Sequence, residues 1–130
     1  MAPLILLVDD FDDARDMYRE YLQFRGLRVI TADGGRQSVD LAKHHRPDLI
    51  LMDLRMPGVS GFDALKELRA DDSLNGIPVV ALTAQAMDDE RRLVLRAGFD
   101  QMVSKPCLPD ELFRIIAELL SQWRPDLAPL

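Results

Sequence analysis

The feature that most constrains the fold is a short apolar run, Leu49–Met52, which ends directly on a carboxylate, Asp53. Turn-forming residues bound this run, with Pro47 before it and Pro57-Gly58 after it. A continuous apolar run between turn signals is typical of a strand that is buried on both faces of a sheet. Ligands of open parallel sheets bind at the carboxyl ends of such strands. The sequence therefore predicts that Asp53 lies at the ligand-binding edge of a central strand.

Three further apolar runs also end at polar residues. The polar residues at or near their ends are Asp9, Asp10, Thr83 and Lys105. Because the carboxyl ends of parallel strands meet at one edge of the sheet, we expect these side chains to lie close to Asp53. Carboxylates, a hydroxyl and an ammonium would then share one crevice.

Segments with helical periodicity separate these runs. The predicted strands span about residues 4–9, 27–32, 49–53, 77–83 and 99–104. The predicted helices span about residues 13–25, 35–45, 61–70, 87–97 and 109–121. Asp12 is placed to cap the first helix and Gly26 to end it, while Pro47 ends the second helix. This alternation of strands and helices predicts an α/β fold.

Length and composition limit the domain organisation and the class of partner. The chain of 130 residues predicts one domain over residues 1–122, followed by a short tail, 123–130, that we expect to fray. The formal net charge of −6 argues against a nucleic-acid surface, which needs a basic patch. The N-terminal apolar run is too short to span a membrane. The single cysteine, Cys107, fits a reducing, cytoplasmic compartment.

The order and spacing of these polar residues resemble those of the receiver domain of two-component response regulators, over about residues 4–121. The motifs that carry the resemblance are Asp9-Asp10, Asp53 with Met56-Pro57-Gly58, Thr83-Ala84, and Lys105-Pro106. The resemblance implies a flavodoxin-like, doubly wound parallel sheet of five strands in the order 2-1-3-4-5, flanked by five helices. It also implies a cis peptide bond between Lys105 and Pro106.

A magnesium site is the first chemical hypothesis for this edge. Taken alone, Asp9-Asp10 can be a solvated strand end followed by a helix cap. Three neighbouring carboxylates repel one another, however, and Mg²⁺ prefers oxygen ligands, including carboxylates and phosphate. The resemblance implies that Asp10 and Asp53 bind Mg²⁺ directly, that Asp9 binds it through water, and that the backbone carbonyl of Arg55 completes the protein ligands.

Phosphoryl transfer is the second hypothesis. The resemblance makes Asp53 the phosphoryl acceptor, and a carboxylate can form such an acyl phosphate. Lys105 would supply a cation to one phosphoryl oxygen, and Thr83 a hydroxyl to another. Arg55 and Gln85 are expected to tune how fast water removes the phosphoryl group. Met102 stands where many receivers carry an aromatic residue, so we expect it to follow the switch by repacking rather than by a two-position flip.

The function that the resemblance implies is a phosphorylation-activated signalling switch rather than an enzyme, apart from its own phosphorylation and autodephosphorylation. The expected partners are a sensor histidine kinase or histidine phosphotransfer protein, which donates the phosphoryl group, and a downstream protein target. We expect neither nucleic acid nor a membrane as partner. The fourth helix, fifth strand and fifth helix would form the output face, through which the chain is a monomer or a weak dimer. The chain is too short for an output domain, so it acts as a lone receiver or is part of a longer protein.

Two rival functions use some of the same residues. Asp10-Phe11-Asp12 is similar to the DxD motif of haloacid-dehalogenase-type Mg²⁺ phosphatases, in which Asp10 would be the nucleophile. That family gives no role to Asp53 with its Met-Pro-Gly segment, and it needs a further acidic pair at a strand end after the lysine. A flavin carrier would need a Ser/Thr/Gly-rich phosphate loop after the first strand, where acids stand instead.

Overall fold

The computed structural model describes residues 2–84 and 87–127, which form five parallel strands in one sheet, in the order β2-β1-β3-β4-β5. The strands are β1 (Leu4–Val8), β2 (Arg28–Ala32), β3 (Leu49–Asp53), β4 (Val79–Thr83) and β5 (Gln101–Ser104). This order confirms the prediction, including the weakly apolar β2 and the short β5 at the two edges of the sheet.

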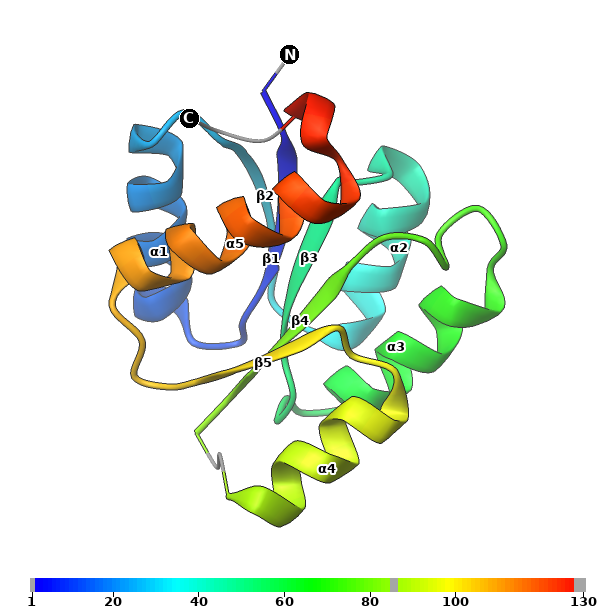
Figure 1. Cartoon of the computed structure of the whole chain (residues 1–130). Coiled ribbons are helices and arrows are strands. Elements are labelled where there is room, and N and C mark those ends of the chain that lie inside the picture. Colours follow the sequence, from blue (N-terminus) through cyan, green and yellow to red (C-terminus); the bar gives the residue numbers. More distant parts are fainter. Residues whose placement is uncertain (1, 85–86, 128–130) are drawn as a thin grey trace.

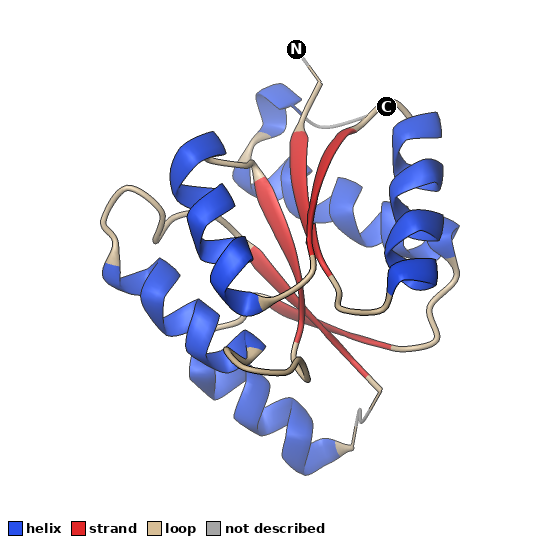
Figure 2. Cartoon of the chain, turned by 180° about the vertical axis from the view of Figure 1, so that it is seen from behind, coloured by secondary structure: helices blue, strands red, loops and turns tan. Residues whose placement is uncertain are grey.

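Helices cover both faces of this sheet (Figures 1 and 2). They are α1 (Asp12–Phe24), α2 (Gly35–His45), α3 (Gly61–Ala70), α4 (Asp88–Ala97) and α5 (Pro109–Trp123), followed by a short 3₁₀ helix, η1 (Pro125–Leu127). Helices α1 and α5 pack on one face, and α2, α3 and α4 pack on the other. The doubly wound α/β fold is therefore confirmed. Among the helices of the described segments, none has both the length and the apolar character needed to cross a bilayer.

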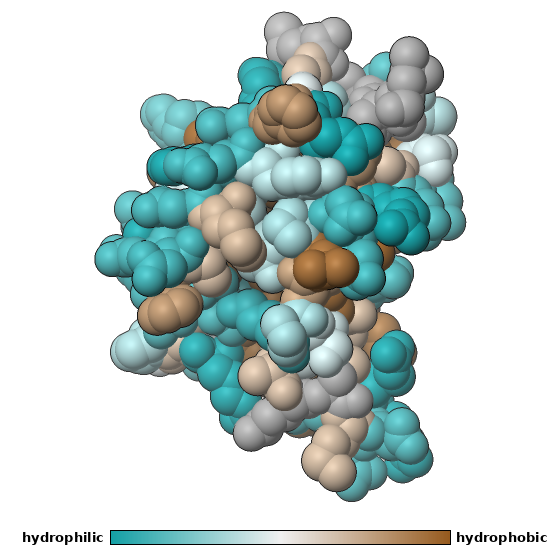
Figure 3. Space-filling view, turned by 90° about the vertical axis from the view of Figure 1, so that its left-hand side faces the viewer, coloured by the Kyte–Doolittle hydropathy of each residue, from teal (hydrophilic) through white to brown (hydrophobic). Residues whose placement is uncertain are grey.

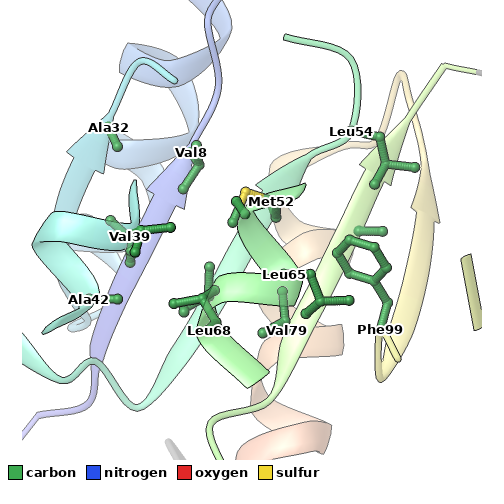
Figure 4. Packing of buried hydrophobic residues seen from close by; sticks show 14 of the residues in the cluster. Val8, Ala32, Val39, Ala42, Met52, Leu54, Leu65, Leu68, Val79 and Phe99 are labelled. Atoms are coloured by element: carbon green, nitrogen blue, oxygen red, sulfur yellow. The ribbon is translucent and has the colours of Figure 1, made fainter. Parts of the chain in front are cut away.

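The alternation of side chains along the strands divides the core into two layers. In β3, Ile50 and Met52 face the layer under α2, α3 and α4, while Leu49 and Leu51 face the layer under α1 and α5. Figure 4 shows the first of these layers, in which Met52 lies among side chains from strands and helices. Every residue of β3 is buried, which is why its sequence is apolar up to the final aspartate.

The first helix corrects one prediction. Asp12 is the first residue of α1, and Phe11 occupies the N-cap position, so the prediction that Asp12 caps this helix is wrong. Asp9 instead accepts a hydrogen bond from the Phe11 backbone N–H at 2.9 Å. Asp12 forms an ion pair with Arg15 at 2.6 Å. Gly26, at a φ of +92°, follows the C-terminus of the helix as expected.

The C-terminal end is more structured than the sequence suggests. Helix α5 continues to Trp123, two residues beyond its predicted end, and Arg124 forms an ion pair with Asp48 at 3.0 Å. The same Asp48 accepts a hydrogen bond from the Leu4 backbone N–H at 2.8 Å. These contacts lie at the edge of the sheet opposite to the carboxyl ends of the strands. The division into a domain of residues 1–122 and a tail of residues 123–130 stays a prediction.

Candidate functional site

The parallel register brings three aspartates together. Val8, the last residue of β1, pairs with Met52, the residue before Asp53 in β3. The acids that follow these positions are therefore neighbours. Within the described segments, Asp9, Asp10 and Asp53 form a group in which one carboxylate oxygen from each lies within 4.8 Å of the others. Asp9 and Asp53 are buried and Asp10 is exposed, so the group opens to solvent on one side.

Lys105 completes this acidic group. Its ammonium donates a hydrogen bond to Asp9 Oδ2 at 2.9 Å and lies 3.5 Å from Asp53 Oδ2. Residue pairing of Thr83 with Ser104 places Lys105 just beyond the end of β5. The Lys105 backbone N–H then donates to the Thr83 carbonyl at 2.8 Å. The Lys105–Pro106 peptide bond is cis, which confirms the prediction.

The electrostatics of the site follow from burial and from these charges. Burial raises the pKa of Asp53 to about 6, and the negative charge of Asp9 adds to this effect, whereas Lys105 opposes it. Burial lowers the pKa of the Lys105 ammonium, but its hydrogen bond to Asp9 and the charge of Asp53 outweigh burial, so this pKa lies above its ordinary value. Lys105 therefore remains a cation at neutral pH.

Three other residues that the sequence assigned to the site or the switch, Thr83, Arg55 and Met102, have different surroundings. Thr83 is buried at the carboxyl end of β4, the strand next to β3. The Arg55 backbone N–H donates to Asp53 Oδ1 at 3.4 Å, and the Arg55 guanidinium pairs with Glu90 of α4 at 3.2 Å. Met102 is buried in the core layer under α4. Gln85 lies outside the described residues.

The loop from β3 to α3 needs two glycines for different reasons, Gly61 for close packing and Gly58 for its backbone conformation. A Cβ atom on Gly61 would lie 2.5 Å from the backbone oxygen of Asp53, and Gly58 has a φ of +75°. Ser60 caps α3 by accepting a hydrogen bond from the Asp63 backbone N–H at 3.2 Å. The absence of a side chain at Gly61 therefore lets the start of α3 pack against the backbone of Asp53.

An open, mostly apolar groove of about 330 Å³ adjoins the lysine. Its lining includes Phe11, Ala14, Met17, Tyr18, Lys105 and Pro106. Phe11 and Met17 are 63% and 45% exposed, although Met17 lies at helical spacing from the apolar residues Ala14 and Tyr21 of α1. Figure 3 views the molecule from this side and shows apolar side chains between polar ones.

Sequence reasoning overlooked two residues near the site. Helical spacing in the sequence predicts only that Tyr18 lies on the apolar face of α1, whereas in the structure its hydroxyl donates to the Cys107 carbonyl at 2.7 Å. In the sequence Glu90 is one charged residue among several at the start of α4, whereas in the structure it pairs with Arg55, which stands 35 positions earlier in the chain. Helical periodicity places Tyr18 inside the fold but gives no signal for its partner.

A doubly wound sheet with an acidic pocket and a lysine at its carboxyl edge has the fold and the pocket of a receiver domain. The family "Response regulator receiver domain" matches residues 5–117 of the sequence. The chain therefore belongs to this family, whose members are signalling switches of two-component systems.

Relatives and solved structures agree with this assignment. The polar-differentiation response regulator DivK of Brucella anthropi is 38% identical over 106 residues, which cover 82% of this chain and 86% of DivK. The chemotaxis protein CheY4 of Vibrio cholerae has 28% identity and a TM-score of 0.88, with 92% of this chain and 100% of that one covered. The receiver domain of the sensor histidine kinase PA1611 from Pseudomonas aeruginosa, which has a magnesium ion coordinated in its active-site cleft, has 36% identity and a TM-score of 0.83, covering 95% and 98% of the two chains.

The geometry also counts against the phosphatase alternative. The Asp12 side chain is 80% exposed and pairs with Arg15, and this second acid of the DxD motif does not belong to the group of three aspartates. Asp110 and Glu111, the acidic pair after the lysine, lie in the first turn of α5 rather than at a strand end.

Proposed function

We propose that Asp53 is the phosphoryl acceptor of this receiver domain and that its phosphorylation changes the affinity of the chain for a protein target. The observation that carries this proposal is the position of the Lys105 ammonium, 2.9 Å from Asp9 and 3.5 Å from Asp53. An ammonium between these carboxylates can neutralise a phosphoryl oxygen once Asp53 is modified. The buried carboxylate of Asp53 at the end of the central strand supports its role as acceptor.

Mg²⁺ is the cofactor of this proposal. Three carboxylates within 4.8 Å repel one another, and a hard divalent cation with oxygen ligands relieves that repulsion. Asp10 and Asp53 would bind the ion directly, Asp9 through water, and Arg55 through its backbone carbonyl. When bound, the ion supplies charge neutralisation at the phosphoryl group. The magnesium ion coordinated in the PA1611 receiver domain supports this choice.

The chemistry of the proposed step is a displacement at phosphorus. A carboxylate oxygen of Asp53 forms the new bond to phosphorus, while the bond from phosphorus to the histidine nitrogen of the donor breaks. Lys105 binds one phosphoryl oxygen and the Thr83 hydroxyl donates to another. Water later cleaves the acyl phosphate, at a rate tuned by Arg55 and Gln85. The chain acts on itself in both steps and is not an enzyme for a separate substrate.

The proposed phosphodonor is a sensor histidine kinase or a histidine phosphotransfer protein. The apolar groove beside Lys105, with Phe11 and Met17 exposed at it, supports an approach over α1 and the loop between β5 and α5. A partner that packs there would bring a phosphohistidine close to Asp53. A cytoplasmic location also belongs to this proposal.

The proposed output face consists of α4, β5 and α5, and it binds a downstream protein target or a second copy in a weak dimer. Helix α4 exposes two leucines, Leu93 and Leu95, on either side of the buried Val94, which supports a protein partner at this helix. We propose that Thr83 and the loop after it move on phosphorylation and that Met102 follows by repacking. Methionine is unbranched and adapts to changed surroundings without a preferred planar orientation.

Phosphorylation by acetyl phosphate in the presence of Mg²⁺ tests the acceptor. Asp53→Asn should abolish stable labelling, because an amide cannot form the acyl phosphate, while circular dichroism should show an intact fold. Asp12→Asn is the matched control, since Asp12 is an exposed acid near the site, and it should label normally. Labelling that persists in Asp53→Asn and disappears in Asp10→Asn would support the phosphatase mechanism and contradict the proposal.

A further inference from the structure

Tyr18 makes a polar contact that the phosphoryl-transfer proposal does not use. Its side chain is 4% exposed and lies in the core layer between α1 and α5. The phenolic hydroxyl donates a hydrogen bond to the Cys107 carbonyl at 2.7 Å. Burial raises the pKa of this phenol, so the hydroxyl remains protonated and able to donate. A hydrophobic residue would fill the same position in α1 but would leave the carbonyl without this donor.

The contact falls on the short segment that carries the lysine. This segment leaves β5 at Ser104 and enters α5 at Pro109. At its start, the Lys105 backbone N–H donates to the Thr83 carbonyl of β4 at 2.8 Å. Two residues later, the Cys107 carbonyl accepts a hydrogen bond from Tyr18 of α1 at 2.7 Å. The backbone on both sides of the Lys105 side chain is therefore held by a hydrogen bond to another element.

We propose that Tyr18 is a positioning residue for phosphoryl transfer, which fixes the segment after β5 so that the Lys105 ammonium meets the phosphoryl group at Asp53. This inference rests on the proposed function of Asp53 and Lys105. A buried hydrogen bond to a backbone carbonyl restrains that carbonyl in both distance and direction. The lysine ammonium, two residues earlier in the chain, sits at its hydrogen-bonding distance from Asp9 only while the backbone of this segment stays in place.

The physical consequence is a loss of rate rather than a loss of metal. None of the three carboxylates belongs to the segment that Tyr18 holds. Removing the hydroxyl should therefore leave the affinity for Mg²⁺ unchanged, while Lys105 samples positions away from Asp53. Misplacement of a charge-stabilising group by about 1 Å can reduce a rate as much as 100-fold. We expect a smaller reduction, because the Lys105 backbone N–H keeps its hydrogen bond to the Thr83 carbonyl.

The experiment measures the rate constant of phosphorylation by acetyl phosphate and the Kd of Mg²⁺ for matched variants. Tyr18→Phe removes only the hydroxyl, and we expect it to slow phosphorylation about tenfold with the Kd of Mg²⁺ unchanged. Tyr21→Phe is the control, since Tyr21 is the other tyrosine of α1 and its hydroxyl accepts from the exposed Arg25. It should phosphorylate at the wild-type rate.

A double-mutant cycle separates positioning from general support of the fold. In a Lys105→Ala background, Tyr18→Phe should have no further effect on the rate, because the residue through which Tyr18 acts is gone. An equal slowing in both backgrounds would overturn the proposal, and so would an unchanged rate in Tyr18→Phe alone. If wild-type protein takes no label on Asp53, the proposed function itself fails, which is a different outcome from either of these.

A spectroscopic measurement keeps the proposal testable even if Tyr18→Phe folds poorly. The chain contains two tyrosines, so 3-fluorotyrosine incorporated into Tyr21→Phe protein gives one ¹⁹F resonance, from position 18. Beryllofluoride, which mimics the phosphoryl group, should shift this resonance when Lys105 is present and leave it unshifted in Lys105→Ala. A resonance that responds equally in both proteins, or in neither, would show that Tyr18 is not coupled to the lysine.

Discussion

Helices α4 and α5 flank the same edge of the sheet, yet they are held in different ways. Within α4, all of which the structure describes, Val94 alone is buried, whereas Leu93 and Leu95 are 53% and 47% exposed. Helix α5, also described throughout, buries a continuous apolar face. The buried residues of this face are Leu112, Phe113, Ile116, Leu119 and Leu120.

This difference divides the proposed output face into a fixed part and a part that can move. Apolar burial ties α5 to the sheet, so that α5 should exchange its amide hydrogens only when the whole domain unfolds. Helix α4 has little apolar burial, and the ion pair of its Glu90 with Arg55 links it to the residues that follow Asp53. A charge added at Asp53 can therefore reach α4 through few contacts and at little cost in core packing.

The largest expected effect is on the free energy of unfolding, when one apolar side chain is truncated in each of the two helices. Ile116→Ala should lower the free energy of unfolding by about 3 kcal/mol, because it removes a fully buried side chain from α5. Leu95→Ala in α4 should lower it by about 1 kcal/mol or less, because that residue is about half exposed. Urea denaturation measures both values. Similar losses for the two variants would show that α4 is packed as firmly as α5.

Met102 lies on β5, on the face that α4 covers. Met102→Ala should lower the free energy of unfolding by about 2 kcal/mol, because the side chain is buried. The gain in target affinity after beryllofluoride treatment should change little if Met102 only repacks. A variant with nearly normal stability but without this gain in affinity would instead make Met102 the element that transmits the signal to α4.

The charge of Asp53 provides a test through pH. In the metal-free chain, burial raises the pKa of Asp53 from 3.8 to about 6, so the folded state binds the proton more tightly than the unfolded state. The resulting stabilisation is complete below about pH 4 and is lost as the pH rises through about 6. Asp53→Asn removes this titration; the pKa of about 6 already includes the opposing attraction to Lys105, and solvent at the open side of the site weakens the effect of burial. We therefore expect the variant to be more stable by about 1 kcal/mol at pH 7.5, with the advantage disappearing at pH 4.

Hydrogen exchange of the same variant sharpens the comparison. Amides of α5 should exchange more slowly in Asp53→Asn at pH 7.5 than in the wild-type protein, since they exchange by global unfolding. Amides of α4 should keep their wild-type rates, since they exchange by local opening. Equal slowing in both helices would show that α4 unfolds only with the rest of the domain.

The smallest expected effect concerns the contact between Glu90 and Arg55. Glu90→Gln should lower the free energy of unfolding by less than about 1 kcal/mol, because the Arg55 side chain is 61% exposed and such ion pairs are weak. Exchange in α4 should nevertheless become faster, while exchange in α5 stays the same. Asp89→Asn is the matched control, because its side chain is 99% exposed in the same helical turn. If both variants behave alike, the Glu90 contact does not hold α4.

The sequence by itself determined the strands and the edge at which the site lies. A strand that is buried on both faces is apolar along its length, so the first polar residue after the apolar run marks the end of the strand. Asp53 marks the end of β3 in this way. Asp9, Asp10, Thr83 and Lys105 could be assigned to the same edge because all parallel strands end there. The acidic pocket was therefore predictable without knowledge of any contact between distant residues.

Only the tertiary structure decided which side chains meet within each layer. Helical periodicity indicates which face of a helix points inward but not how deeply each side chain is buried. Met17 on the apolar face of α1 is exposed, while Phe113 of α5 is buried. The hydrogen bond from Tyr18 to Cys107 joins residues 89 positions apart, and the pair of Arg55 and Glu90 joins residues 35 apart. Such contacts depend on how helices pack across strand ends, and local sequence carries no record of that packing.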